Sequence, residues 1–177
     1  MVSHIHSIKN GEPCRKAAGE GPDERWHEKN DCRALAESVQ LYNRMPSLVI
    51  DTSAVLAVLL DEPTRPVLIT ATEGCSLVGA PSLSSEVGNA LVAGFRRRRL
   101  AVETVLGAWA NYQKVRVRLA DIDVRNALEI AMELGLYAYD AYVLETARAE
   151  RLPMLTLDAG LARAATRLGL KMVEVEK

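Results

Sequence analysis

Four acidic side chains, Asp51, Glu86, Asp140 and Asp158, could do chemistry together. Asp51 and Asp158 each end a short apolar run typical of a buried strand, whereas Glu86 and Asp140 fall near the start of predicted helices. In open α/β sheets such positions meet at one edge. Four crowded carboxylates repel one another and need a cation. Oxygen ligands of this kind suit Mg²⁺ or Mn²⁺, and such ions can support phosphodiester hydrolysis.

Each acid also has a simpler structural interpretation. Asp51 and Asp158 can cap the helices that follow them. Asp140 can be a favourable negative charge near a helix N-terminus, and Glu86 can be a solvated helix residue. The shared strand-end and helix-start positions of all four favour the functional interpretation.

The composition after Met45 restricts the chemistry to acids and hydroxyls. All 3 histidines precede Met45, and Cys75 is the only thiol after it. Histidine catalysis and His- or Cys-ligated zinc are therefore excluded from this part of the chain, which also lacks GxGxxG, GxxxxGK[ST] and GxSxG motifs. Thr52, Ser53 and Thr156 are either ordinary turn and strand residues or groups that hold a carboxylate or a metal-bound water.

Alternating strands and helices must position these groups. Strands are expected at 48–50, 75–80, 115–119, 153–158 and 171–175, and helices at 52–60, 61–73, 81–95, 102–112, 123–134, 139–151 and 159–168. This repeated alternation predicts an α/β fold with a mostly parallel sheet and helices on both faces.

Helical spacing predicts which side chains are buried. Phe95 continues the apolar stripe of the helix at 81–95, and both Phe95 and Trp109 are expected in the core. Tyr139 shares an apolar face with Tyr142 and Val143. The early helices hold more apolar residues than one face would bury, so some either pack on the sheet and a dimer mate or line a groove for a partner helix: Leu56, Val58, Leu59, Leu60 and Leu68.

Length and charge set broad limits. The 177 residues are 49% hydrophobic, which is enough for one sizeable core. The 22 basic and 23 acidic residues nearly cancel, so net charge indicates no polyanionic partner. The sequence has no apolar run of the roughly 18 residues that a membrane span needs and no signal-peptide core, which predicts a cytoplasmic protein.

The chain divides near Met45. Residues 1–44 are expected to be a disordered or non-native N-terminal extension with one weak helix at 32–41, and Met45 is a plausible alternative start. Residues 45–177 are expected to form the folded domain. Cys14, Cys32 and Cys75 lie far apart without a CxxC pair, so neither a disulfide framework nor a zinc site is predicted.

Four motifs in order resemble those of a known family. They are Val49-Ile50-Asp51-Thr52-Ser53-Ala54, Pro81-Ser82-Leu83-Ser84-Ser85-Glu86-Val87-Gly88-Asn89-Ala90-Leu91, Tyr139-Asp140-Ala141-Tyr142 and Leu155-Thr156-Leu157-Asp158-Ala159-Gly160-Leu161. The set is similar to that of PIN-domain nucleases, closest to the VapC toxins of bacterial type II toxin–antitoxin pairs. The resemblance implies a PIN-like three-layer α/β/α sandwich and covers roughly residues 48–175.

The same resemblance implies an activity and partners. The family's members are Mg²⁺- or Mn²⁺-dependent endoribonucleases, so Asp51 and Asp140 would be the more direct metal ligands. Glu86 and Asp158 would complete the shell or act through water, and Thr156 could support them. A homodimer and a cognate antitoxin whose C-terminal tail blocks the site are also implied.

A run of four arginines ends the helix at 81–95: Arg96, Arg97, Arg98 and Arg99. It is either a solvated helix end that suits the helix dipole or a surface that holds RNA phosphates, which Arg116 and Arg118 could extend. An acidic segment of an antitoxin could use the same charges.

Two other classes of function stay open. One is a nuclease-like module that binds RNA or a protein without hydrolysis. The other is a different Mg²⁺-dependent phosphoryl-transfer hydrolase, such as a phosphatase or a structure-specific DNA nuclease. Against a haloacid-dehalogenase phosphatase, Asp51 is followed two residues later by Ser53 and not by a second Asp.

Overall fold

A computed structural model describes residues 45–175, and the predictions for residues 1–44 lie outside this part of the chain. Its sheet is entirely parallel and has the strand order β3-β2-β1-β4. The strands are β1 (Ser47–Ile50), β2 (Ser76–Gly79), β3 (Val117–Leu119) and β4 (Met154–Leu155). The predicted parallel sheet is confirmed.

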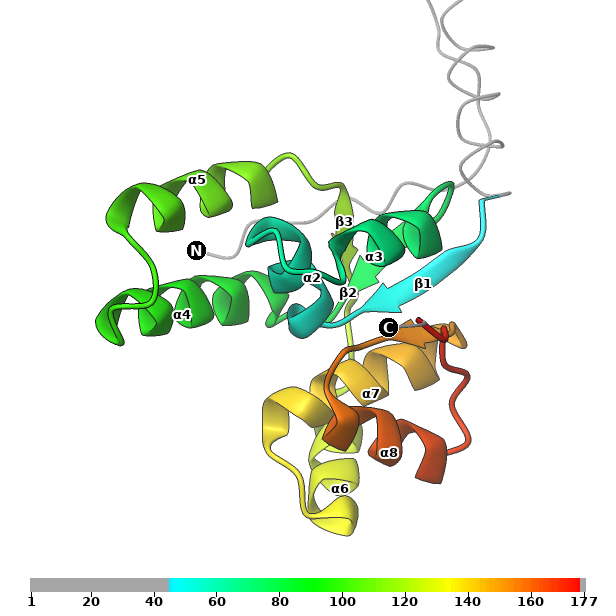
Figure 1. Cartoon of the computed structure of the whole chain (residues 1–177). Helices are drawn as coiled ribbons and strands as arrows, with labels where there is room; N and C mark the ends of the chain where they lie inside the picture. The colour runs from blue at the N-terminus through cyan, green and yellow to red at the C-terminus, as the bar shows by residue number, and fades with distance from the viewer. Residues whose placement is uncertain (1–44, 176–177) are drawn as a thin grey trace, which may run out of the picture. The chain divides into compact units, whose positions relative to one another are not determined.

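All but the last of the helices lie in connections between successive strands, and together they cover both faces of this sheet (Figure 1). They are α2 (Thr52–Leu59), α3 (Arg65–Thr72), α4 (Leu83–Arg96), α5 (Val102–Tyr112), α6 (Val124–Leu134), α7 (Ala138–Glu150) and α8 (Ala159–Arg167). Gly135 ends α6 with φ 67°, a left-handed conformation that glycine adopts without strain.

Side chains of the strands alternate between two cores, which gives three layers. Leu48, Ile50 and Leu155 pack with helices α2 to α5 on one face, whereas Val49 and Met154 pack with α6 to α8 on the other. Both cores are built from buried aliphatic residues, so burial of apolar area stabilises each layer. The result is the expected α/β/α sandwich.

Strand register brings the polar residues to one edge. Ile50 is paired with Leu155 in neighbouring parallel strands, so the residues that follow them, from Asp51 and from Thr156, leave the sheet side by side. Gly79 ends β2, where an added Cβ would lie 2.5 Å from Cδ2 of Leu83. This close approach lets α4 begin directly above the sheet edge.

The last two predicted strands depart most from those observed, and the helix expected at 61–73 begins only at Arg65. The strand expected at 171–175 is wrong, because this segment makes only a single bridge between Met154 and Met172. The strand expected at 153–158 shrinks to Met154–Leu155, since Thr156 turns towards Asp51 and hydrogen-bonds it. Because β4 has only two residues, it offers few backbone groups for pairing with a further strand at 171–175.

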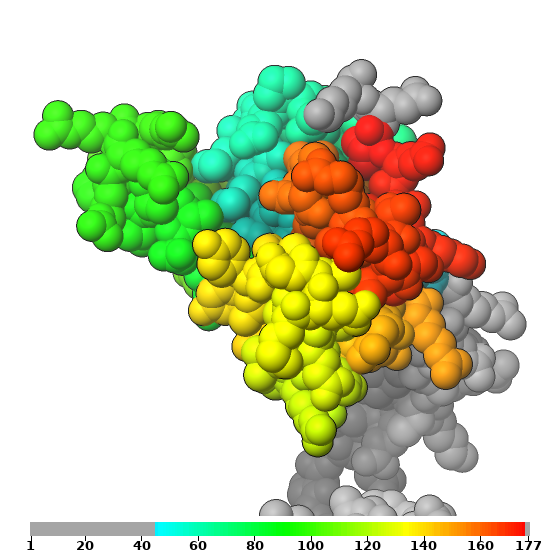
Figure 2. Space-filling model, turned by 90° about the horizontal axis from the view of Figure 1, so that it is seen from below, coloured from blue at the N-terminus to red at the C-terminus, as the bar shows by residue number. Residues whose placement is uncertain are grey.

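Burial also departs from the prediction at two helix positions. Phe95 and Tyr139 lie on predicted apolar faces but are 47% and 56% exposed, and Leu106, another apolar residue of α5, is 63% exposed. Phe95 and Leu106 are on the α4–α5 hairpin, which projects beyond the sheet and the α6–α8 layer in both views (Figures 1 and 2). No described element covers the outer part of that hairpin. Trp109 does pack against the core, as expected.

Candidate active site

The Asp51 carboxylate is buried at the end of β1, with only 7% of the residue exposed. Its Oδ2 accepts hydrogen bonds from the Ser53 backbone N–H at 3.2 Å, the Ser53 hydroxyl at 2.5 Å and the Thr156 hydroxyl at 2.8 Å. The first of these bonds caps α2. No donor from residues 45–175 bonds Oδ1. The side chain is therefore held in one orientation with one oxygen available to a ligand.

Two hydroxyls join the loops that follow β1 and β4. Oγ of Ser53 lies 3.2 Å from Oγ1 of Thr156 and accepts the Leu157 N–H at 2.9 Å. Oγ1 of Thr156 accepts the Asp158 N–H at 3.0 Å. Ser53 and Thr156 thus both hold the Asp51 carboxylate through their hydroxyls and are not only turn and strand residues.

Glu86 lies in the first turn of α4 and is also oriented by hydroxyls. Oε2 accepts the Thr52 hydroxyl at 3.2 Å, and Oε1 accepts the Ser82 hydroxyl at 2.6 Å. The bond from Thr52 connects the start of α2 to α4, so Glu86 faces the sheet edge that carries Asp51. It is not the freely solvated residue of the simpler interpretation.

Asp140 lies in the first turn of α7 and is close to two of the other acids. Partial burial, followed by the negative charges of Asp158 and Asp51, raises the pKa of Asp140 above its ordinary value of 3.8. Asp158 is exposed and caps α8, because its Oδ1 accepts the Leu161 N–H at 2.8 Å. Capping occupies Oδ1, and the second oxygen is left for other contacts.

A cavity of about 420 Å³ lies between α4 and the start of α7. Its polar lining includes two of the predicted acids, and its lining residues are Thr52, Ser85, Glu86, Asn89, Ala90, Tyr137, Tyr139 and Asp140. Ser85, Asn89 and Tyr137 were not among the site residues predicted from the sequence. Asn89 had a usable signal, because it follows Glu86 by three residues and so shares its helix face. Tyr137, in a connector, had none.

The donor set suits a hard divalent cation. Carboxylate and hydroxyl oxygens are the ligands that Mg²⁺ and Mn²⁺ prefer, and none of the four acids forms an ion pair with a residue in 45–175. Within the same range, no three acid, histidine or cysteine side chains are grouped closely enough to hold a metal ion. A bound ion would therefore have to draw the carboxylates together, and the metal site stays a prediction.

The four arginines lie at the opposite end of α4 from Glu86. Arg96 is the last residue of the helix, and all four are exposed. Ten residues separate Glu86 from Arg96, which corresponds to about 15 Å along a helix axis. The structure therefore does not bring the arginines into contact with the carboxylates. Arg118 forms a two-pronged pair with Glu150, at 3.0 and 2.7 Å.

Comparison with known proteins identifies the family. A family model described as PIN domain matches residues 48–167. The chain belongs to the PIN-domain family. The match includes all four acids, and PIN domains are generally nucleases, which supports a hydrolase that acts on nucleic acids. No curated protein sequence matches this PIN chain.

Solved structures share the PIN fold at low sequence identity. PAE2754 from Pyrobaculum aerophilum is 23% identical with a TM-score of 0.55, and the match covers 73% of this chain and 84% of that one. VapBC2 from Rickettsia felis, solved with a DNA fragment from its promoter, is 11% identical with a TM-score of 0.52, covering 73% and 99%. At these identities the similarity shows the fold alone. Among residues 45–175 of this PIN chain, no helix is long and apolar enough to cross a bilayer.

Proposed function

We propose that this PIN domain is a metal-dependent endoribonuclease that hydrolyses RNA phosphodiester bonds through Asp51, Glu86, Asp140 and Asp158. The observation that carries the proposal is the buried Asp51 carboxylate. It has an oxygen open to a ligand at the sheet edge, and no cation from the described residues neutralises it. Buried charges are normally paired or bound to a metal.

The four acids would have different roles at the metal site. Asp51 and Asp140 would hold Mg²⁺ or Mn²⁺, and Glu86 and Asp158 would complete the shell or orient a water. When bound, such an ion supplies an activated water and stabilises the charge that develops on phosphate oxygens. Ser53 and Thr156 fix the orientation of Asp51 through their hydroxyls, which is the role expected of residues behind a metal ligand.

Exposed cations provide a place for the RNA backbone. Arg96, Arg98 and Arg99 line an open cavity of about 560 Å³ with Phe95 and Leu100. Basic side chains of this kind position a nucleic acid through its phosphates. Because the run is about 15 Å along α4 from Glu86, it would bind phosphates several nucleotides from the site of cleavage.

The biological setting would be a toxin–antitoxin pair, with a homodimeric toxin and a cognate antitoxin. Two apolar surfaces support the proposal that this protein binds partner chains. Val92, Phe95, Val102 and Leu106 form an exposed apolar patch on the α4–α5 hairpin. A separate apolar cavity of about 110 Å³ lies beside α2 and α3, with Val58, Leu59 and Leu68 among its lining residues. Leu68 is itself buried, so the excess apolar residues of these helices serve both the core and this cavity.

The test is cleavage by purified, antitoxin-free protein with single-stranded and structured RNA, in Mg²⁺, Mn²⁺ or EDTA. Wild-type protein is expected to cut RNA only with a divalent cation, and Asp51→Ala and Asp140→Ala are expected to lose the activity while remaining folded. Matched DNA and a small phosphate ester serve as competing substrates.

The outcomes separate the classes of function. Unchanged cleavage by both variants would contradict the proposed site. Preference for DNA or for the phosphate ester would indicate a different phosphoryl-transfer hydrolase. RNA binding by folded protein without cleavage in any metal would indicate a non-catalytic PIN-like module.

A further inference from the structure

Two tyrosines on the rim of the acidic cavity have no role in the proposed metal site. Tyr137 and Tyr139 line this cavity together with Glu86 and Asp140. They are nevertheless 85% and 56% exposed. Large aromatic rings so open to water beside a polar site can serve as binding surfaces, because one side of the ring remains available to a planar ligand.

Local structure holds both rings at this place. Tyr137 is the N-cap residue of α7, and the preceding Leu136 packs against the core. Tyr139 lies one residue before Asp140 and meets Tyr142 edge to face, with ring centroids 5.9 Å apart and an interplanar angle of 86°. This contact restricts the Tyr139 ring while leaving more than half of the residue exposed.

The charge of the cavity explains why an aromatic contact is needed. Carboxylates repel the phosphates of an approaching RNA, and the exposed arginines lie at the other end of α4. Stacking of a base on an aromatic ring is uncharged and tolerates any base, because every base has a π-face. Such stacking can hold the RNA close to the carboxylates without adding a cation there.

We propose that Tyr137 and Tyr139 stack on an unpaired base next to the scissile phosphate. This inference rests on the proposed ribonuclease function and adds to it a base contact made by two residues outside the metal site. Bases in an A-form duplex are already stacked on their neighbours and cannot splay onto a side chain. Asn89 and Ser85, on the opposite wall of the cavity, can hydrogen-bond the edge of the same base.

Binding can be measured separately from cleavage. In the Asp51→Asn background, which is expected to leave RNA intact, a single-stranded RNA carrying one 2-aminopurine is titrated with protein. Anisotropy reports the Kd, and quenching of the 2-aminopurine fluorescence reports stacking. Tyr137→Ala and Tyr139→Ala should each weaken binding about tenfold and reduce the quenching.

Conservative and control variants identify the cause. Tyr137→Phe and Tyr139→Phe should keep both affinity and quenching, because the ring and not the hydroxyl makes the contact. Met132→Ala removes a 76% exposed apolar side chain from α6 that does not line the cavity, and it should change neither readout. Denaturant unfolding of each variant checks that the fold is retained.

The result also distinguishes this inference from the proposed function. Metal-dependent RNA cleavage by wild type, with equal affinity and quenching in the Tyr137→Ala/Tyr139→Ala double variant, would overturn the stacking role alone. Equal affinity for duplex and single-stranded RNA would also overturn it. Folded, antitoxin-free wild-type protein that neither binds nor cleaves any RNA would overturn the proposed function and this inference together.

Discussion

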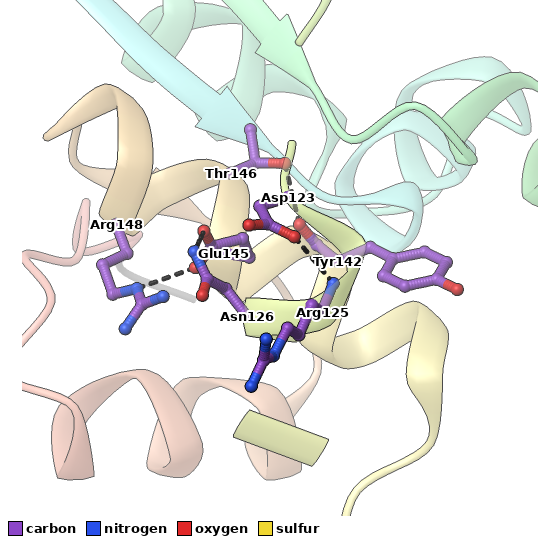
Figure 3. A network of polar contacts seen from close by, with 7 residues as sticks. All are labelled: Asp123, Arg125, Asn126, Tyr142, Glu145, Thr146 and Arg148. Carbon is purple, nitrogen blue, oxygen red and sulfur yellow. Dashed lines mark hydrogen bonds and ion pairs between the residues drawn. The ribbon is translucent and has the colours of Figure 1, made fainter. Parts of the chain in front are cut away.

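Asp51 at the sheet edge and Glu145 between α6 and α7 are the two buried acids among residues 45–175, and their surroundings differ. Figure 3 shows Glu145 held between Asn126, whose Nδ2 donates to Oε1 at 3.3 Å, and Arg148, whose Nε donates to Oε2 at 2.7 Å. Asp51 has hydroxyl and amide donors on one oxygen and no cation from the described residues.

This difference separates a structural carboxylate from one that can serve a ligand. The charge of Glu145 is satisfied inside the fold, so its contribution is to join α6 to α7. The charge of Asp51 is oriented but not neutralised, and two further acids, Asp140 and Asp158, lie near it. Removing the charge of Asp51 should therefore lower activity and leave stability unchanged. Removing the cation that pairs with Glu145 should lower stability and leave activity unchanged.

The largest effect is expected for Asp51→Asn. The amide oxygen can accept the same hydrogen bonds, and the repulsion among the acids falls, so the free energy of unfolding should stay within about 1 kcal/mol of wild type. Metal-dependent RNA cleavage should fall about a thousandfold, equivalent to about 4 kcal/mol. Cleavage rates and urea unfolding of the same preparations measure both quantities.

Asp121→Asn is the matched control, because Asp121 is an exposed acid outside the cavity. It should change neither quantity. A large loss of stability in Asp51→Asn would mean that Asp51, like Glu145, is a structural acid.

Arg148→Ala should produce the largest loss of stability. Glu145, whose side chain is 3% exposed, would remain buried with only Asn126 as a partner. An uncompensated buried charge of this kind costs about 3 kcal/mol. Urea unfolding measures the loss, and RNA cleavage at a temperature where the variant is folded should be unchanged.

Arg125→Ala provides the comparison for Arg148. Arg125 is 86% exposed and pairs with Glu129 on the surface of α6, so its removal should cost less than about 0.5 kcal/mol. Equal losses in the two variants would show that Glu145 does not depend on Arg148.

Thr156→Val tests the contribution of the hydroxyl that hydrogen-bonds Asp51. The variant removes the 2.8 Å hydrogen bond to Asp51 and the acceptor for the Asp158 N–H. Loss of such support behind a metal ligand typically lowers metal affinity or activity by about 10-fold or more. Cleavage across a series of Mg²⁺ concentrations should show that Thr156→Val needs more Mg²⁺ than wild type. Thr156→Ser keeps the hydroxyl and should have the wild-type Mg²⁺ requirement. No change in Thr156→Val would mean that Ser53 alone orients Asp51.

The smallest effect is expected for the exposed pair between β3 and α7. The hydrogen bond from Arg118 lowers the pKa of Glu150 below its ordinary 4.5, against the opposing effect of partial burial. Because the folded-state pKa is depressed, the pair stabilises the protein above about pH 4.5, and this contribution is lost as the pH falls through the folded-state pKa. Glu150→Gln should therefore cost at most about 1 kcal/mol at pH 7 and nothing at lower pH. Unfolding of both proteins at several pH values checks this convergence.

Much of the fold could be read from local patterns. The short apolar runs that precede Asp51 and Asp158 lie next to turns and helix starts, so the presence of a strand before each acid and the capping role of each acid were predictable. Burial of Phe95 was predicted wrongly, because helical spacing indicates an apolar face but not whether another element covers it. The strand expected at 171–175 failed for a similar reason, since pairing depends on a partner strand of sufficient length.

The sequence by itself determined the alternation of strands and helices, the absence of histidine chemistry after Met45 and the choice of the four acids as candidates, because these follow from residue types and their local periodicity. Only the tertiary structure decided that Ser53 and Thr156 share one oxygen of Asp51 and that Tyr137 lines the same cavity as Glu86. It also showed that the arginine run lies away from the carboxylates. The physical reason is that these relations join residues far apart in the chain, and strand register and helix packing set their distances.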